Sequence, residues 1–390
     1  LEKIASIYTS KENKDDFAAS AMSAVKEADS YFTGATESML AWSEIWDAAD
    51  MEIEGDREAQ KLLRLHIYHL MCSFSPHNAK LDASITARGL HGEAYRGHIF
   101  WDELYILPWY CKTFPEAAKA MLMYRYRRLD KAREYANIHG FEGAMFPWQS
   151  GSDGREETQV VHLNPISGKW GDDYSSLQRH VSLAVAFNVY TYFHLTNDVE
   201  FMNSYGLEML LEISRFWVSK AKKDAEDRYS IDGVMGPDEF HEKLPGDNKG
   251  GLKDNAYTNI MTAWLLEEIE ALKNNENIDF SNVCNTLKVS DHELEKWADV
   301  AGKLNLVISE EGVISQFDGY FDLKELDWDD YRKRYGNIHR MDRILKSEGL
   351  SPDNFKVAKQ ADTLMTFYNL NNETVTGIIH DLGYEVPEDY

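Results

Sequence analysis

Helical periodicity runs through almost the whole of this chain and constrains its fold more than any other feature. Apolar residues recur at positions i, i+3 and i+4, the spacing that places them on one face of an α-helix. The only segment that favours short strands is 305–316. The pattern predicts helices over residues 14–30, 36–50, 57–74, 94–111, 115–137, 175–195, 198–222, 254–274, 291–304, 336–348, 355–370 and 373–383.

Long breaks rich in Gly, Pro, Asp and Asn separate these helices, notably at 140–173 and 231–254. No segment of 20 to 50 residues repeats, which argues against a solenoid built from a consensus repeat. Paired helices with functional loops on one side indicate an all-α fold, a toroid of α-hairpins. Because 390 residues exceed one ordinary domain, we expect a large helical domain with an appendage.

Charge and cysteine content limit the classes of partner. A formal net charge of −25 argues against binding to nucleic acid or to anionic membranes, which basic surfaces contact. No stretch approaches the ~20 apolar residues that a membrane span needs. Cys72, Cys111 and Cys284 lie far apart in apolar runs, so we expect buried free thiols and a cytoplasmic location. A small neutral or polar substrate fits this composition.

The segment 236–242, Gly-Pro-Asp-Glu-Phe-His-Glu, is the best candidate for acid–base chemistry. Proline followed by acidic residues also occurs at ordinary helix starts, where the helix dipole favours negative charge. Catalysis is favoured because Asp238 and Glu239 are adjacent carboxyl groups. A neighbouring negative charge and partial burial both raise a carboxyl pKa, as a general acid at neutral pH requires.

Several aromatic and amide residues suit a sugar pocket, although core packing is the alternative for each of them. The rings of Tyr95, Trp101 and Trp148 lie beside charged or amide residues, and flat ring faces fit the apolar faces of a sugar. Asn255 and Tyr257, within 254–259, add amide and hydroxyl groups that can orient hydroxyls.

Metal and nucleotide sites are not expected. His91, Glu93 and His98 have no second cluster with ligand spacing, and residues 150–157 lack the acidic ladder of a calcium loop. No Gly-Lys-Ser/Thr phosphate loop or dinucleotide fingerprint occurs. We therefore expect neither a metal nor an organic cofactor.

Four ordered segments together resemble glycoside hydrolase family 65: residues 92–102, 144–149, Gly-Pro-Asp-Glu at 236–239 and Lys-Gln-Ala-Asp at 359–362. That family contains maltose, trehalose, kojibiose and nigerose phosphorylases along with some hydrolases. The resemblance implies an (α/α) barrel of six hairpins and inverting chemistry on a disaccharide. It also implies a helical linker over 1–75 and a catalytic barrel over 76–390 that lacks its C-terminal end.

The resemblance also implies roles for individual residues. Glu239 matches the general acid, whereas Trp101, Asp102, Lys359 and Gln360 match positions that hold the glucosyl unit. We add Tyr95, His98, Trp148, Asn255 and Tyr257 as further substrate-binding residues.

Two departures from the family are visible. The flanking β-domains and the Ser-rich phosphate loop that the family carries are not within this sequence. We therefore expect the chain to be part of a larger protein, with homodimerisation left open.

An inverting enzyme needs an acid that protonates the leaving oxygen and an attacker on the opposite face of the sugar. Phosphate can itself attack, so a phosphorylase needs no second catalytic carboxylate, whereas a hydrolase needs a base roughly 6.5 to 9.5 Å from the acid. We expect phosphorolysis of an α-linked glucose disaccharide to β-glucose 1-phosphate, with inorganic phosphate as co-substrate. Inverting hydrolysis is the alternative, and a non-catalytic sugar-binding fragment is a more remote one.

Overall fold

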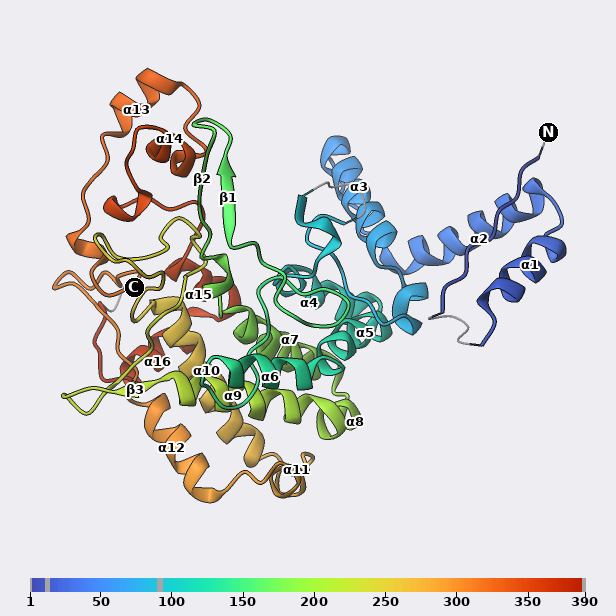
Figure 1. Cartoon of the computed structure of the whole chain (residues 1–390). Coiled ribbons are helices and arrows are strands. Elements are labelled where there is room, and N and C mark those ends of the chain that lie inside the picture. Colours follow the sequence, from blue (N-terminus) through green and yellow to red (C-terminus); the bar gives the residue numbers. More distant parts are fainter. Residues whose placement is uncertain (1, 11–14, 90–93, 388–390) are drawn as a thin grey trace. The chain divides into compact units, whose positions relative to one another are not determined.

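The computed structural model describes residues 2–10, 15–89 and 94–387, which form two compact units (Figure 1). The first unit comprises Leu1–Gly97 and Tyr105–Tyr124, and the second comprises His98–Leu104 and Arg125–Tyr390. The separation of a linker from a barrel after residue 75 is a different division of the chain, and it stays a prediction.

The first unit is helical. Asp16, Ser30 and Asp56 cap its first three helices, because their side-chain oxygens accept backbone N–H groups that have no partner within the helix. The Tyr110 hydroxyl donates to the Phe74 carbonyl oxygen at 2.6 Å. The helices are α1 (Phe17–Glu27), α2 (Tyr31–Ala49), α3 (Arg57–Ser73), a 3₁₀ helix (Pro76–Lys80), and most of α4 (Glu103–Thr113) and α5 (Pro115–Tyr126).

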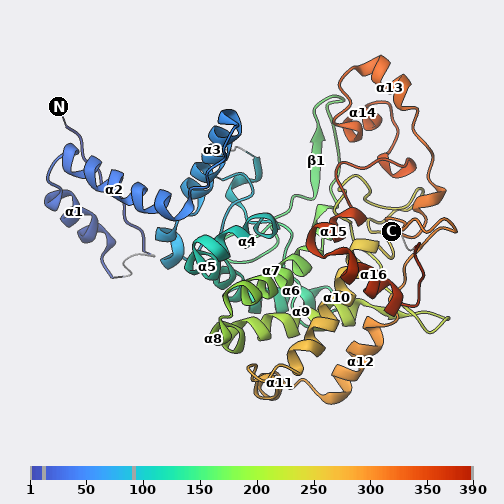
Figure 2. The same ribbon diagram turned by 180° about the vertical axis from the view of Figure 1, so that it is seen from behind.

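The second unit is built around α10 (Ala256–Lys273), which packs against helices α7, α9, α12 and α16 (Figures 1 and 2). Its other helices are α6 (Leu129–Ile138), α7 (Val181–Thr196), α8 (Val199–Phe201), a π-helical turn (Met202–Gly206), α9 (Leu207–Lys220), α11 (Phe280–Leu287), α12 (Asp291–Ala301), α13 (Trp328–Tyr335), α14 (Met341–Ser347), α15 (Thr366–Asn369) and α16 (Asn372–Asp381). Further 3₁₀ turns lie at Ser175–Leu177, Tyr320–Asp322, Pro352–Asn354 and Thr363–Met365.

Helix α7 and the first half of α10 are buried on nearly every face, as their central position requires. All eleven residues from Ala256 to Leu266 are buried, as are ten of the sixteen residues in α7. A helix without a polar face is stable only when other elements surround it. Helix α9, which packs against both, buries eleven of its fourteen residues.

Two small antiparallel hairpins accompany the helices. Strands β1 (Val161–Asn164) and β2 (Lys169–Asp172) lie beside α14, and the Asn164 side chain donates to the Arg343 carbonyl oxygen at 3.1 Å (Figure 1). Strands β3 (Lys222–Lys223) and β4 (Tyr229–Ser230) form the second hairpin. The segment 305–316, where strands were expected, forms only an isolated bridge between Ile308 and Ile314.

Four helix predictions were wrong in extent. Residues 115–137 form two helices, α5 and α6, rather than one. Residues 94–111 do not form one helix, because Tyr95 and Arg96 adopt left-handed backbone conformations and α4 begins only at Glu103. Residues 336–348 contain only the seven-residue α14. In the predicted helix 355–370, the residues up to Asp362 are mostly irregular. Lys359 and Gln360 in this segment contact Glu239, about 120 residues earlier in the sequence.

Membrane and thiol predictions have simple outcomes. Within the described residues, none of the helices combines the length and the apolar content that crossing a bilayer requires. All three cysteines are free thiols, as expected; Cys111 and Cys284 are buried and Cys72 is partly buried.

Candidate active site

Glu239 lies on a tight turn whose backbone is strained. Its N–H donates to the Gly236 carbonyl oxygen at 3.4 Å, and Pro237 and Asp238 occupy the two central positions of the turn. Glu239 has a φ of 64°, in the left-handed region that residues with a side chain rarely adopt. Such a conformation costs about 1 to 3 kcal/mol and persists where neighbouring groups hold it, commonly at active sites.

Lys359 and Gln360 converge on the carboxyl group of Glu239. The Lys359 ammonium donates to Glu239 Oε2, and the Gln360 side chain donates to Glu239 Oε1 at 3.1 Å and to the Pro237 carbonyl oxygen at 2.7 Å. The side chains of Glu239 and Lys359 remain 25% and 29% exposed, so a ligand can reach them. The structure thus brings together three residues that the sequence analysis assigned to the site.

Asp238 and His241 form a buried pair on either side of Glu239. Asp238 Oδ2 faces His241 Nδ1 at 2.8 Å, and His241 Nε2 faces the Phe355 carbonyl oxygen at 2.9 Å. Burial by itself lowers the pKa of His241, but the hydrogen bond and the charge of Asp238 outweigh it, so the pKa is raised. The imidazole is therefore held more strongly in its protonated form than a free histidine.

Asp362 supports the same turn from the other side. Its carboxyl oxygens accept from Asn255 Nδ2 at 2.9 and 3.2 Å. A Cβ atom added to Gly236 would lie only 2.0 Å from Asp362 Oδ2, so glycine is required for this close approach. Burial and the nearby charge of Asp238 raise the pKa of Asp362 to about 8. Asp362 therefore tends to stay protonated at neutral pH.

Asn255 has a structural task at this point. Its Nδ2 also donates to the Gln316 carbonyl oxygen at 3.0 Å, and its Oδ1 caps α10 by accepting from the backbone and hydroxyl of Thr258. These bonds occupy the hydrogen-bonding capacity of the amide. Direct contact between Asn255 and a sugar, which stays a prediction, would require one of them to break.

Several buried aromatic rings lie around Trp101 in the second unit. The Trp101 ring lies 6.1 Å from Trp148, 4.7 Å from His180 and 6.3 Å from Tyr257, measured between ring centroids. Trp101 and Trp148 are each 6% exposed, and Tyr257 is fully buried. The Tyr257 hydroxyl accepts from Asn369 Nδ2 at 3.1 Å. Three predicted site residues therefore lie together.

Asp102 is a second carboxyl group of the site with an unusual environment. Burial raises its pKa to about 6, and the charges of Glu103 and Glu239 contribute to the increase. Behind it, Arg125 and Glu103 form a buried ion pair at 2.8 Å, and the same guanidinium donates to the Phe100 carbonyl oxygen. This pair holds the backbone on which Trp101 and Asp102 lie.

Two predicted residues have a weaker connection to this constellation. His98 is partly buried in the second unit, and Tyr95 belongs to the first unit, where its exposed ring lies 5.9 Å from the Arg88 guanidinium. Their roles stay predictions. His91 and Glu93 lie outside the described residues.

In the loop after Trp148, the Glu156 carboxyl group accepts hydrogen bonds from the backbone. Glu156 accepts from the N–H groups of Trp148 at 2.8 Å and Gln149 at 3.1 Å, and from the Thr158 hydroxyl at 2.6 Å. Glu156 thereby fixes the Trp148 backbone.

In the part of the chain that the structure describes, there is no group of three or more His, Cys, Asp or Glu residues that could hold a metal ion.

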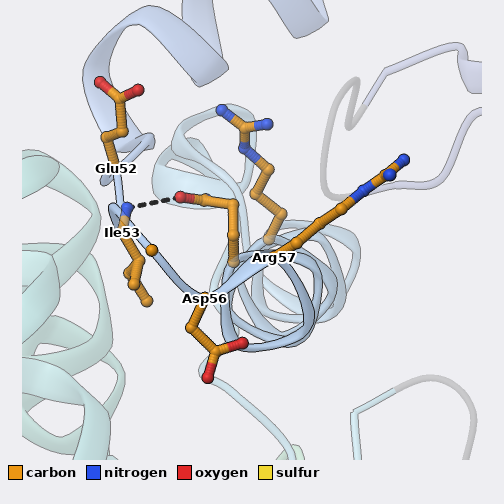
Figure 3. Close-up of a pocket in the computed structure, with 7 residues that line it drawn as sticks. Glu52, Ile53, Asp56 and Arg57 are labelled. Atoms are coloured by element: carbon orange, nitrogen blue, oxygen red, sulfur yellow. Dashed lines mark hydrogen bonds between the residues drawn. The ribbon is translucent and has the colours of Figure 1, made fainter.

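A shallow pocket in the first unit is unrelated to these groups. It lies at the start of α3, where Gln60 accepts the Ile53 N–H at 2.6 Å (Figure 3). Asp56 caps the helix, and Arg64 is paired with Asp50. Two of its charged groups, Asp56 and Arg64, are thus used to maintain the local fold.

His180 is a member of the aromatic cluster that the sequence analysis missed. It is fully buried at the start of α7, and its Nδ1 lies 3.3 Å from the Met235 carbonyl oxygen. Nε2 has no hydrogen-bond partner among the described residues, and burial lowers the pKa of the ring to about 3, so the imidazole is neutral. A single histidine before an apolar helix carries no signal that separates such a residue from an ordinary core histidine.

The sequence is similar to that of known proteins over most of its length. An uncharacterized glycosyl hydrolase of Mycobacterium tuberculosis is 46% identical over 387 residues, which cover 98% of this chain and 29% of that protein. Trehalose 6-phosphate phosphorylase of Lactococcus lactis subsp. lactis is 47% identical over 352 residues, covering 90% of this chain and 44% of that protein. The chain thus spans less than half the length of either relative.

A solved structure described as "Putative kojibiose phosphorylase from human microbiome" matches with a TM-score of 0.77 and 26% identity, over 95% of this chain and 51% of that one. This match confirms the expected fold class, an all-α (α/α) six-hairpin barrel. The family model for the glycosyl hydrolase family 65 central catalytic domain matches residues 64–382. The family model and the relatives match most of the sequence, and the four short motifs agree with them. The chain therefore belongs to glycosyl hydrolase family 65.

Proposed function

We propose that this chain carries the catalytic machinery of an inverting glycoside phosphorylase. The substrate class is an α-linked glucose disaccharide, inorganic phosphate is the co-substrate, and β-glucose 1-phosphate is the sugar product. No metal or organic cofactor takes part. The observation that carries the proposal is the turn at Glu239, where a reachable carboxyl group is held by Lys359 and Gln360.

The names of the relatives favour phosphate as the attacker. Trehalose 6-phosphate phosphorylase and kojibiose phosphorylase of Thermoanaerobacter brockii are 47% and 41% identical to this chain over the matched residues. Both names describe phosphorolysis of a disaccharide. We infer the same class of reaction here, with the acceptor sugar left to experiment.

In the proposed reaction Glu239 gives its proton to the glycosidic oxygen while a phosphate oxygen attacks C1 from the opposite face. The C1–oxygen bond breaks, the leaving sugar departs as an alcohol, and the configuration at C1 changes from α to β. Lys359 contacts the Glu239 carboxyl group in the present structure, so it must release that group before the proton can be transferred. In our proposal it then binds a sugar hydroxyl together with Asp102.

Hydrolysis of the same bond is the second candidate, and Asp102 is the observation that favours it. The charge of Glu239 contributes to the raised pKa of Asp102, so the two carboxyl groups interact. An inverting hydrolase needs such a pair, with the base ionised to activate water. With a pKa of about 6, Asp102 is mostly ionised at pH 7.

The test uses the full-length protein and a panel of α-linked disaccharides that includes trehalose, trehalose 6-phosphate, kojibiose, nigerose and maltose. Each is incubated with and without inorganic phosphate, and the products are followed by ¹H and ³¹P NMR. We expect phosphate-dependent consumption of one of them and a β-anomeric glucose 1-phosphate signal. Equal release of free glucose in both reactions, without sugar phosphate, would establish hydrolysis instead.

A further inference from the structure

The contacts within the turn do not account for the strained backbone conformation of Glu239. Its left-handed φ of 64° is stabilised within the turn only by a long hydrogen bond of 3.4 Å. Lys359 and Gln360 hold the carboxyl group, but both residues are exposed to solvent. A strained conformation persists when surrounding groups over-determine it, so the support must come from the buried side of the turn.

Asp238 and His241 supply one part of that support. Asp238 Oδ1 accepts the backbone N–H groups of Phe240 and His241, while Oδ2 faces the His241 ring. Both ring nitrogens of His241 face oxygen acceptors, and only the doubly protonated ring can donate to both. Asp238 and a doubly protonated His241 therefore close a buried ring of hydrogen bonds around the backbone that follows Glu239.

Asp362 supplies the other part. Its carboxyl group is 2% exposed, lies against Gly236 and accepts from the residue that caps α10, Asn255. Asp362 and Asn255 thereby connect the backbone before Glu239 to the N-terminus of α10, a helix that is buried throughout its first half. Phe240, immediately after Glu239, is anchored in a hydrophobic cluster with Leu326, Met341 and Leu345.

We propose that Asp238, His241 and Asp362 are positioning residues for proton transfer, a buried support that holds the strained backbone of Glu239 and aims its carboxyl group at the leaving oxygen. This inference rests on the proposed function of Glu239 as the acid. None of the three residues needs to touch the sugar. Their effect is on the position of the acid, and a displacement of 1 Å can lower a rate by about 10²-fold.

The choice of leaving group separates positioning from a merely structural role. The acceptor sugar of a disaccharide is a poor leaving group as an alkoxide, so it needs the proton from Glu239 to depart as an alcohol. α-Glucosyl fluoride reacts by attack at C1 and loss of fluoride, which departs with the bonding electrons and needs no proton. A variant with a misplaced acid should therefore fail on the disaccharide and still react with the fluoride, whereas a damaged site should fail on both.

The variants Asp238→Asn, His241→Gln and Asp362→Asn are compared with wild type and with Glu239→Gln in the full-length protein. For the disaccharide that wild type cleaves, we expect kcat to fall by about 10²-fold with KM within about threefold. The rate with α-glucosyl fluoride should stay within about threefold of wild type, and Glu239→Gln should show the same pattern with a larger loss.

Asp254→Asn is the matched control. Asp254 is equally buried just before α10 and accepts from Ser230, Ile231 and Asn259, but none of these bonds reaches the Glu239 turn. This variant should lower the melting temperature without changing the ratio of disaccharide to fluoride rates. Parallel loss on both substrates in the three positioning variants, wild-type kcat in all of them, or failure of all three to fold would overturn the proposal.

Failure of the phosphorylase assignment and failure of the positioning role give different results. If wild type releases no sugar phosphate but hydrolyses the disaccharide, the phosphorylase assignment fails while the ratio of rates still tests the positioning residues. If wild type acts on neither the disaccharides nor the fluoride, the proposed function itself fails.

Discussion

At the scale of single residues, Asp102 and Glu239 show how environment separates two carboxyl groups of one site. Asp102 is largely buried, and its pKa rises to about 6 because burial and neighbouring negative charges disfavour ionisation. Glu239 is a quarter exposed and lies against the Lys359 ammonium. The two carboxyl groups of the site thus lie in different surroundings.

Replacing Asp102 by Asn should lower kcat/KM by roughly tenfold or more, because a charged hydrogen bond to a sugar contributes about 1.5 to 3 kcal/mol. Stability should not fall, since the raised pKa means that the ionised form is disfavoured in the folded protein. Steady-state kinetics and thermal melting at pH 8 measure both. An unchanged kcat/KM together with a clearly lower melting temperature would show instead that Asp102 is a structural residue.

At the scale of elements, the site forms where two irregular segments contact each other beside the N-terminus of α10. The turn 236–239 and the segment 359–362 are held together by side chains, and Asn255 joins them to α10. In a helix or a strand the adjacent residues Lys359 and Gln360 would point to different sides, whereas here both side chains contact Glu239. The helix predicted over 355–370 was wrong for this reason.

Gly236→Ala should disrupt this junction. The added Cβ would lie 2.0 Å from Asp362 Oδ2 and 2.4 Å from Asn255 Nδ2, so the turn or the helix cap must shift. We expect a loss of about 1 to 3 kcal/mol in stability, typical of overpacking, together with a lower kcat. Gly171→Ala, in β2 with no heavy atom within 4 Å, should change neither denaturation nor kinetics. A variant at Gly236 with wild-type stability and activity would contradict the packing described here.

At the scale of the whole molecule, several buried carboxyl groups make stability depend on pH. Burial raises the pKa of Asp102 to about 6, of Glu242 and Glu267 to about 7, and of Asp362 to about 8. In the unfolded chain these groups lose their protons near pH 4. Between pH 6.5 and 8 the folded state therefore binds more protons than the unfolded state, and stability falls as the pH rises.

The melting temperature should accordingly fall by a few degrees between pH 6.5 and 8, for a loss of about 1 to 3 kcal/mol. The raised pKa of His241 acts in the same direction, whereas the lowered pKa of His180 affects stability only below pH 6.5. Calorimetry at constant ionic strength measures the trend. Glu242→Gln should melt near wild type at pH 6.5 and above it at pH 8; a flat or rising wild-type curve would contradict this account.

Much of the fold could be read from local pattern. The helices predicted over 175–195, 198–222 and 254–274 overlap α7, α9 and α10, because apolar spacing in the sequence reports directly on which helix faces are buried. The starts of α7 and α9 were predicted too early. The order of the four motifs sufficed to indicate the family, and Glu239 could be proposed because its acidic and histidine neighbours are adjacent in sequence.

Tertiary structure alone decided how the site is assembled. Lys359 and Gln360 contact Glu239, which lies about 120 residues earlier in the sequence. The His180 ring packs against Trp101, and the Asn255 amide donates to Asp362. No local pattern encodes these contacts, since each depends on where two separately formed elements end after packing. Periodicity records burial along one element, whereas the direction and partner of a polar side chain follow only from the neighbours that the fold supplies.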